Sequence, residues 1–352
     1  MMRRLALLFV TLGTALSVAG VIVGASPGSR PVVPGATGTV WAVERFDGGI
    51  NTLAGFDAAT GEVLGVVPIG RRPIGVTAPH GTGKVYTADE RSNQLSVLSK
   101  DSFTIVKQIP TGTLSFPHHV MASPNGKFIY FGRYNTNTVG VADTTTDEMV
   151  ATWQASENPL AKTHAVWITD DGKDLYATNE VANSVSKLDA ETGDRVWEFG
   201  IGSRPSEVLV TPDRKTAYVT VRNENKVKIL DISGDLPVLA GEEVIGVQPD
   251  TMQITNDGKT LVVGLRAIPQ MALMDTETLE VRPVTFPGYG ISGHQWLSAN
   301  GKFTYIALES MDSTKPGGIA VVENETGDVR DIWTYPGGAW PHGVFYEPQS
   351  LR

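Results

Sequence analysis

The sequence contains no cysteine. This absence excludes disulfide bonds, catalysis by a thiolate, a zinc site with cysteine ligands and the C-x-x-C-H attachment of a c-type haem. Any metal ion that the protein binds must therefore be held by histidine, carboxylate or backbone oxygen ligands. Histidine is also scarce, with six residues in 352, so a place where histidines gather is informative.

Basic residues are in deficit, because 29 Lys and Arg residues stand against 38 Asp and Glu residues and the formal net charge is −9. The chain has no basic stripe of the kind that follows a phosphate backbone, so we expect no nucleic-acid partner. It also lacks long segments with a 3.6-residue hydrophobic period, whereas Gly (38) and Pro (21) are frequent. These features favour an all-β chain with many tight turns.

The one long apolar run lies at the start of the chain. Arg3 and Arg4 precede an uncharged stretch from residue 5 to residue 25, which ends in Val-Gly-Ala. Such a pattern is typical of a secretory signal peptide, but the run is also long enough to span a bilayer. We therefore interpret residues 1–25 as a signal peptide or an N-terminal membrane anchor.

Export is expected in either case. We predict a protein that is secreted, periplasmic or in the cell envelope, or else anchored and facing outward, with membrane contact only through this first segment. Residues 26–39 are rich in Gly, Pro and Ser and are predicted to form a flexible tether.

A turn motif recurs along the rest of the chain with a nearly constant period. A loose copy ends at Lys84, and the others are SPNGK at 123–127, TDDGK at 169–173, TPDRK at 211–215, TNDGK at 255–259 and SANGK at 298–302. Their last lysines are 43, 46, 42, 44 and 43 residues apart. A period of about 44 residues with four short strands per copy is typical of a β-propeller blade.

We predict a single domain at 40–348, an all-β, seven-bladed β-propeller of four-stranded antiparallel blades. The first strands of the blades are expected to begin near Ile74, His118, His164, Ser206, Asp250, Gly293 and His342. The stretch after residue 40 holds three strands and lacks a first one, while the chain ends just after its seventh first strand. The C-terminal strand is therefore predicted to close the N-terminal blade, which removes free sheet edges.

Two segments, AYVTVRNENKVKILDISGD and LYATNEVANSVSKLDAETGDRV, resemble the YVTN-type (YncE-like) β-propeller repeat, and the resemblance covers essentially all of 40–348. Relatives by resemblance include exported proteins of unknown role, surface-layer proteins, sugar-lactone hydrolases and the haem-binding propeller of cytochrome nitrite reductases. In that haem group, histidines on one face of the propeller bind or flank the cofactor. The segment PTGTLSFPHHVMASPNGKFIYFGR is loosely similar to the one that carries a haem-ligating histidine there.

Aligning the first strands on the turn motif places five of the six histidines in two adjacent columns of the repeat. His118, His164 and His342 share one column, and His119 and His294 share the next. Because the first strand of a blade lines the central channel, both columns are expected to ring one mouth of that channel. Strand alternation predicts that His119 faces away from His118.

Charged and aromatic residues are predicted to complete the rim of a pocket at this mouth. The second strand of a blade runs antiparallel to the first, so the residues that follow it return to the same mouth. These residues are Arg45, Glu90, Arg133, Tyr134, Glu180, Arg222, Arg266 and Glu309. Trp296 and Trp340 flank two of the histidines and are predicted to wall the pocket for a flat ligand. Such convergence from different blades is what a binding site needs.

Neutral imidazoles bind Zn, Cu, Fe or Ni, so His118, His164 and His342 are the predicted metal ligands, with His119 and His294 as further ligand-binding candidates. The predicted cofactor is a His-ligated transition metal or a haem-like group. Imidazole also serves as acid or base, and arginine pairs with a substrate carboxylate or phosphate. The competing interpretation is architectural, since a histidine at the start of an inner strand can satisfy backbone groups there.

Three functional hypotheses follow. The first is an exported propeller that binds a small ligand, or a metal or haem-like cofactor, at a histidine-rich channel mouth. The second is a metal-assisted, lactonase-like hydrolase or lyase acting on a small molecule. The third is a non-catalytic scaffold that binds another exported protein in the cell envelope. The sequence assigns no catalytic residue and leaves the ligand open.

Overall fold

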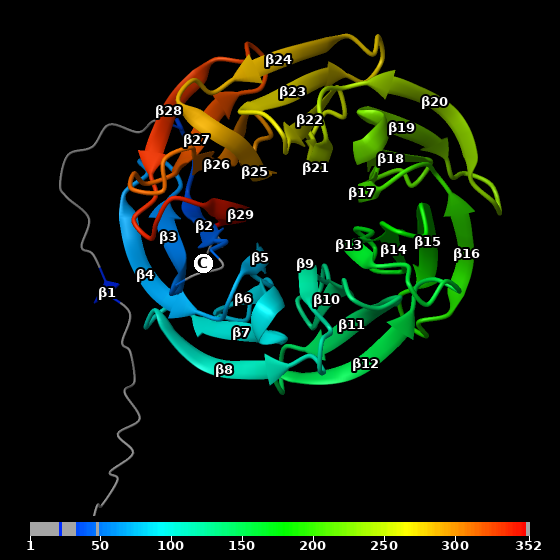
Figure 1. Cartoon of the computed structure of the whole chain (residues 1–352), viewed down its shortest axis with the longest axis horizontal. Coiled ribbons are helices and arrows are strands. Elements are labelled where there is room, and N and C mark those ends of the chain that lie inside the picture. Colours follow the sequence, from blue (N-terminus) through cyan, green and yellow to red (C-terminus); the bar gives the residue numbers. More distant parts are fainter. Residues whose placement is uncertain (1–20, 23–32, 47–48, 350–352) are drawn as a thin grey trace, which may run out of the picture.

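A computed structural model of the chain describes residues 21–22, 33–46 and 49–349. The described residues form seven antiparallel sheets arranged in a ring around a central axis (Figure 1). Within each sheet the strands are hydrogen-bonded in chain order from the axis outwards, except in the sheet that the two ends of the chain share. The predicted fold, an all-β propeller with seven blades, is confirmed.

Six blades are continuous in the chain. From the inner to the outer strand, the first two are β5 (Pro73–Thr77), β6 (Lys84–Asp89), β7 (Gln94–Ser99) and β8 (Thr104–Pro110), then β9 (Pro117–Ala122), β10 (Phe128–Arg133), β11 (Thr138–Asp143) and β12 (Glu148–Gln154). The next two are β13 (Thr163–Ile168), β14 (Asp174–Asn179), β15 (Ser184–Asp189) and β16 (Arg195–Gly200), then β17 (Pro205–Val210), β18 (Thr216–Val221), β19 (Lys226–Asp231) and β20 (Val238–Val244). The last two are β21 (Pro249–Ile254), β22 (Thr260–Leu265), β23 (Gln270–Asp275) and β24 (Val281–Thr285), then β25 (Tyr289–Leu297), β26 (Phe303–Ser310), β27 (Gly318–Glu323) and β28 (Val329–Thr334).

The seventh blade joins the two ends of the ring. Its strands, again from the axis outwards, are β29 (Pro341–Pro348), β2 (Gly38–Glu44), β3 (Asn51–Asp57) and β4 (Val63–Ile69). β2 and β29 pair along their whole lengths, so the first long strand of the propeller is bonded to the last. The C-terminal strand closes the N-terminal blade as predicted.

The predicted leader at 1–25 and tether at 26–39 lie outside the described residues, apart from residues 21–22 and 33–39. Val21–Ile22 form the short strand β1, which pairs with the outer edge of β4. The only helical elements in the described ranges are two 3-10 turns, η1 (Glu90–Ser92) and η2 (Arg222–Glu224). No helix there is long and apolar enough to cross a membrane.

The recurrent SPNGK motif forms the tight turn between the first and second strands of a blade. In the copy at 123–127, Gly126 has a left-handed φ of +72° and donates its N–H to Ser123 O at 2.9 Å. Ser123 Oγ accepts the N–H of Phe128 at 2.9 Å, which fixes the start of β10. Arg214 stands at the glycine position of the TPDRK copy and adopts the same conformation, with φ +59°. The repeat thus imposes the turn even where glycine is missing.

The inner strands share an irregularity that positions the site. Between Phe131 and Arg133 the pairing of β10 with β9 shifts by one residue, so His118 and His119 together face Gly132. All seven inner strands have one extra residue at the corresponding place. An extra residue of this kind is a β-bulge, which re-aims the side chains at the bulge.

We expect the substitution Gly132→Ala to destabilise the protein. A Cβ at this position would lie 2.4 Å from the carbonyl oxygen of His164 and 2.8 Å from that of Thr163, both on the inner strand of the next blade. Because these are backbone atoms, relieving the overlap must move a strand, and the free energy of unfolding should fall by about 1–3 kcal/mol. Urea denaturation followed by circular dichroism measures the change.

Gly200→Ala in the outer strand β16 is the matched control, because no atom lies within 4 Å of a Cβ at that position. Its free energy of unfolding should stay the same or rise by up to about 1 kcal/mol. An equal loss in both variants would contradict the importance of the close approach at the bulge.

Glu44 supports the loop that leads into the closing strand. It ends β2 and is buried, and its carboxylate accepts hydrogen bonds from the backbone N–H groups of Trp340 and Ala339 and from the hydroxyl of Thr52. Burial outweighs these bonds and raises the pKa of Glu44 from 4.5 to about 7. The carboxyl group therefore binds a proton more tightly in the folded than in the unfolded chain.

The sign of the pH dependence follows from this pKa. Between about pH 4.5 and about pH 7, Glu44 makes the free energy of unfolding fall as the pH rises, by at most about 1.4 kcal/mol per pH unit. Glu44→Gln keeps a neutral side chain at every pH, so the variant should gain stability relative to the wild type across this window. Urea denaturation at several pH values measures the two curves, and parallel curves would contradict the assignment.

Candidate functional site

Five histidines meet at one mouth of the channel. Their ring centroids are 4.3 Å apart for His118 and His164, 4.6 Å for His119 and His164, 4.4 Å for His119 and His294, and 4.4 Å for His294 and His342. These five residues, here called the histidine cluster, come from the inner strands β9, β13, β25 and β29. The two histidine columns of the repeat thus form one continuous group of rings.

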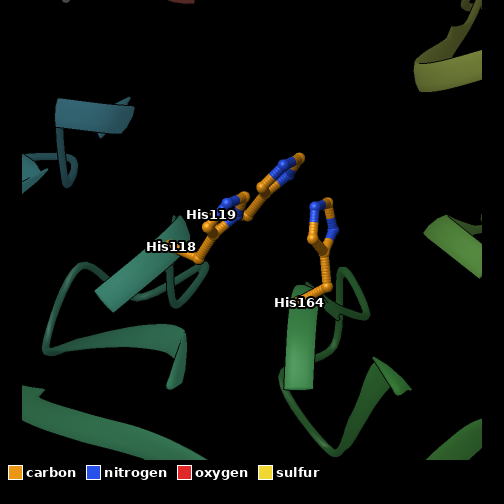
Figure 2. A group of neighbouring side chains, drawn as sticks. All are labelled: His118, His119 and His164. Atoms are coloured by element: carbon orange, nitrogen blue, oxygen red, sulfur yellow. The ribbon is translucent and has the colours of Figure 1, made fainter. Parts of the chain in front are cut away.

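His118, His119 and His164 are its most compact part. Their potential ligand nitrogens, one from each ring, all lie within 4.8 Å of one another. Figure 2 shows the two side chains of β9 and the one of β13 converging on the same space. The rings of His118 and His119 are stacked almost parallel, with centroids 5.1 Å apart and an interplanar angle of 6°.

The prediction that His119 faces away from His118 is wrong. Alternation holds for a regular strand, but these two residues form the bulge of β9 and face the single residue Gly132. Both side chains therefore line the same cavity. Two consecutive histidines can act together here because the strand is irregular.

The predicted metal ligands His118, His164 and His342 do not form one group. The three histidines whose nitrogens converge include His119 in place of His342. β9 and β13 are adjacent in the ring, whereas the blade of β5 separates β9 from β29. His342 consequently lies at the other end of the cluster, against His294.

Both ring nitrogens of His164 have partners. Nδ1 lies 2.8 Å from the carbonyl oxygen of Ser206, which can only accept, so Nδ1 carries the proton. Nε2 then accepts a hydrogen bond from Arg222 Nη2 at 3.2 Å. The neutral tautomer with its proton on Nδ1 and its lone pair on Nε2 is thereby fixed.

His342 follows the same pattern at the opposite end of the cluster. Its Nδ1 donates to Glu309 Oε1 at 3.2 Å, and its Nε2 accepts from Arg266 Nη1 at 3.1 Å. Glu309 also pairs with Arg45 at 3.3 Å. A carboxylate thus orients the imidazole, and an arginine covers its basic nitrogen.

Asp250 occupies the histidine position on β21 and is buried. Its carboxylate accepts hydrogen bonds from Ser206 Oγ at 2.5 Å, from Arg222, and from Arg266 at 3.4 Å. Burial opposes its ionisation, but the two guanidinium groups hold the pKa of Asp250 well below its usual range. A permanent negative charge therefore lies beside the neutral histidines.

Burial lowers the pKa of every imidazole in the histidine cluster well below 6.5, and neighbouring imidazoles and arginines lower it further. The rings are therefore neutral at physiological pH. Neutral imidazole is the form that donates a lone pair to a metal ion.

Besides Arg222 Nε, three buried polar atoms at the cluster have no hydrogen-bond partner within the described part of the chain. They are His118 Nδ1, His119 Nε2 and Glu180 Oε2. The last of these lies 3.9 Å from His164 Nε2 and forms an ion pair with Arg222 Nη1 at 3.5 Å. A buried polar atom without a hydrogen-bond partner costs about 1–3 kcal/mol, so the presence of such atoms on His118, His119 and Glu180 indicates a place for a ligand.

A cavity of about 160 Å³ adjoins the histidine cluster, and all five histidines of the cluster line it. Most of the residues predicted to return to this mouth after the second strands also line it. They are Arg45, Glu90, Tyr134, Glu180, Arg222 and Arg266. Tyr134 stacks on His118 with centroids 5.0 Å apart, while Glu309 stands behind His342.

Two arginines that were not predicted from the sequence also line the cavity. Arg72 pairs with Glu90 at 2.9 Å, and Arg204 pairs with Glu180 at 2.7 Å. Each directly precedes the proline that begins an inner strand, β5 or β17. This shared Arg-Pro pair at the start of a first strand is the signal that would have identified them.

Arg133 does not reach the cavity, contrary to prediction. It is the last residue of β10 rather than a residue of the following turn. Its guanidinium donates to Thr138 Oγ1 at 3.0 Å and to Thr111 O at 3.1 Å. These bonds hold the side chain against neighbouring strands and away from the histidines.

The two tryptophans do not wall this cavity either. Trp296 packs on Phe345 with ring centroids 4.6 Å apart, and Trp340 stacks on Phe46 at 4.7 Å. Trp296 lies further along β25, below the bulge, and Trp340 belongs to the loop before β29. Both serve packing contacts within or beside the closing blade.

Glu207 lies beneath the cluster and was also not selected. It occupies the His119 position on β17 and is buried. Its carboxyl accepts the backbone N–H of Met252, and its Oε1 lies 4.0 Å from His119 Nδ1. Burial raises its pKa well above the usual range. Glu207 thus places a buried carboxyl group beside His119.

Comparison with solved structures shows how widely this fold is used. A functionally unknown protein from Desulfotomaculum acetoxidans has a TM-score of 0.69 and 14% identity over 87% of this chain and 98% of that one. The periplasmic gluconolactonase PpgL of Pseudomonas aeruginosa has a TM-score of 0.68 and 17% identity, over 88% and 98%. The dihydro-heme d1 dehydrogenase NirN, solved with DHE, has a TM-score of 0.60 and 14% identity, over 94% and 80%. At these identities the likeness is one of fold.

No curated protein matches the chain. Residues 63–242, slightly more than half of the chain, match the family described as YNCE-like beta-propeller. The matched segment runs from β4 to β20 and contains four of the turn-motif copies. By this match, the chain belongs to the YNCE-like β-propeller family.

Proposed function

We propose that this protein binds a transition-metal ion, and with it a small ligand, at the histidine cluster. The observation that carries the proposal is the compact group of His118, His119 and His164, whose nitrogens lie within 4.8 Å of one another. In two of these residues a buried ring nitrogen has no partner among the described residues. Coordination to a metal ion would satisfy such nitrogens, and three neutral imidazoles suit Zn, Cu, Ni or Fe.

The partners of the other ring nitrogens support this proposal. Imidazoles that bind metals commonly direct their second N–H toward a carboxylate or a carbonyl oxygen. His164 donates its Nδ1–H to Ser206 O, and His119 has Glu207 Oε1 at 4.0 Å from its Nδ1. This arrangement leaves Nε2 of both rings for the metal ion.

Arg222 and Glu180 complete the environment of the proposed metal ion. Arg222 donates to His164 Nε2, so coordination through that nitrogen requires the guanidinium to withdraw to its carboxylate partner Asp250. Glu180 Oε2, 3.9 Å from His164 Nε2, is a candidate for a fourth ligand.

The cavity favours a metal ion over a haem-like group. Its volume is about 160 Å³, whereas pockets for organic ligands of drug size typically measure about 300–1,000 Å³. Its walls also carry arginines and carboxylates rather than the apolar surfaces that a flat macrocycle would contact. Binding of a haem-like group would require the charged walls to separate.

Replacing His118 with Ala should weaken the binding of Zn²⁺ by about 100-fold or more, because one of three imidazole ligands is lost. Isothermal titration of metal-free protein with Zn²⁺ measures the affinity. His80→Ala is the matched control, since His80 is an exposed turn residue outside the cluster, and it should bind as the wild type does. Equal affinity of the two variants for Zn²⁺ would contradict the proposal.

A second candidate function is hydrolysis of a small lactone or ester. It is favoured by the pairing of His342 with Glu309, because a carboxylate that orients an imidazole is a common arrangement for a general base. The likeness in fold to a periplasmic gluconolactonase adds support. A metal ion at the cluster would lower the pKa of a bound water molecule. Arg266 would have to release His342 Nε2 for this role.

This second function predicts that the wild type hydrolyses a gluconolactone faster than buffer alone. His342→Gln should reduce kcat by about 100-fold, in line with the loss of a general base. The exposed-site control His80→Gln should keep full activity. Acid release in a pH-stat measures the rate, and a wild-type rate equal to the spontaneous one would exclude this function.

We also infer that the protein works outside the cytoplasm. The arginine pair and the uncharged run at residues 3–25 support this. A metal site made of imidazoles rather than thiolates remains functional under oxidising conditions.

A further inference from the structure

Arginines outnumber the carboxylates around the histidine cluster. Five arginines line the cavity: Arg45, Arg72, Arg204, Arg222 and Arg266. The carboxylates that pair with them are Glu90, Glu180, Asp250 and Glu309. Among these nine side chains the guanidinium groups exceed the carboxylates by one, and the neutral imidazoles add no charge.

The imbalance arises because two carboxylates are each shared by two arginines. Glu180 pairs with Arg204 at 2.5 Å and with Arg222 at 3.5 Å. Asp250 pairs with Arg222 and also with Arg266, the latter at 3.4 Å. Arg204 and Arg266 therefore each share a carboxylate with Arg222, which contacts both Glu180 and Asp250.

Arg45 is buried near two other arginines of this group. Burial lowers its pKa to about 10, and repulsion from Arg266 and Arg72 adds to burial, while attraction by Glu309 and Asp250 opposes it. A guanidinium group with a pKa this low lies in a site where another positive charge is unfavourable and a negative charge would be welcome.

A buried donor in the same wall lacks an acceptor. Arg222 Nε is buried and has no hydrogen-bond partner within the described ranges. The whole side chain is only 9% exposed. A buried N–H of a charged group that finds no acceptor is costly. The cavity wall thus offers both positive charge and a donor to a ligand that accepts hydrogen bonds.

We infer that a small oxyanion occupies this cavity together with the metal ion, and that each strengthens the binding of the other. The inference rests on the proposed function, since the metal ion supplies part of the charge that the anion balances. A divalent ion would add two positive charges to a buried site that already has an excess, and uncompensated charge in a low-dielectric site is unfavourable. An oxyanion in contact with the arginines removes that cost, and such coupling is reciprocal.

The cavity volume restricts the size of the anion. A volume of about 160 Å³ lies below the ~300–1,000 Å³ typical of pockets for drug-sized ligands. A carboxylate on a short carbon chain, or a tetrahedral ion of the size of sulfate, fits beside a metal ion in this space. The planar fork of arginine suits both kinds of oxyanion.

The test is a titration of metal-free protein with Zn²⁺ in the presence and absence of acetate. Acetamide, which has nearly the same shape and no charge, is the matched control ligand, and sulfate represents the tetrahedral oxyanions. We expect acetate or sulfate to tighten Zn²⁺ binding by about 10-fold, a typical coupling between two ligands, and acetamide to have no effect. Enhancement by only one of the two anions assigns the site to that class.

Arg45→Gln separates the charge effect from metal coordination. Removal of one repelling charge should tighten the binding of Zn²⁺ alone and abolish most of the enhancement by the anion. Arg204→Gln, at the more exposed rim, should act in the same direction and serves if the first variant does not fold. Arg330→Gln in the outer strand β28 is the matched control and should behave as the wild type does.

The possible failures are distinguishable. Protein that binds Zn²⁺ with the same affinity with and without the anions overturns the inference and leaves the proposed metal site intact. Protein that binds no Zn²⁺ under any of these conditions overturns both. Equal enhancement by acetamide and acetate also overturns the inference, because it would show that charge plays no part.

Discussion

The extra residue at the start of each inner strand is the constraint on which the site depends. A regular strand would send His118 into the channel and His119 into the packing between blades. The bulge places both in one cavity, where they meet His164 of the next blade. The same bulge requires a close approach of neighbouring strands, which explains why Gly132 lies opposite the pair. The propeller therefore builds its binding surface from a defect that recurs in every blade.

The site also depends on the placement of buried charge around neutral imidazoles. Burial keeps the five imidazoles neutral, yet five arginines and four carboxylates surround them. The carboxylates are engaged by arginines, and the imidazole nitrogens without a hydrogen keep lone pairs that are not protonated. A metal ion suits the lone pairs, and an anion suits the arginines. Our proposals treat these as two halves of one binding event.

The ring of blades is regular where it supports the fold and irregular where it meets the cavity. Turns, strand lengths and interblade packing repeat, so the scaffold has a nearly uniform geometry. At the histidine position, by contrast, the blades carry His, Ser, Asp, Gly or Ile. An asymmetric ligand needs such an asymmetric ring. The similarity of the fold to a gluconolactonase and to a dehydrogenase that binds DHE shows that the scaffold itself does not select the chemistry.

The sequence by itself determined the blade number, the closure of the ring and the histidine positions that face one mouth, because a period near 44 residues maps directly onto repeated blades. Periodicity also located most of the rim, including Arg222 and Glu180. Periodicity did not predict the direction of a side chain where that direction depends on a one-residue shift within a strand. Only the tertiary structure decided that His119 joins His118, that His342 is too far around the ring to share a metal with them, and that Arg133 turns away. These outcomes depend on a one-residue shift in strand pairing and on the distances between blades across the ring. A repeating pattern of residue types contains information on neither of them.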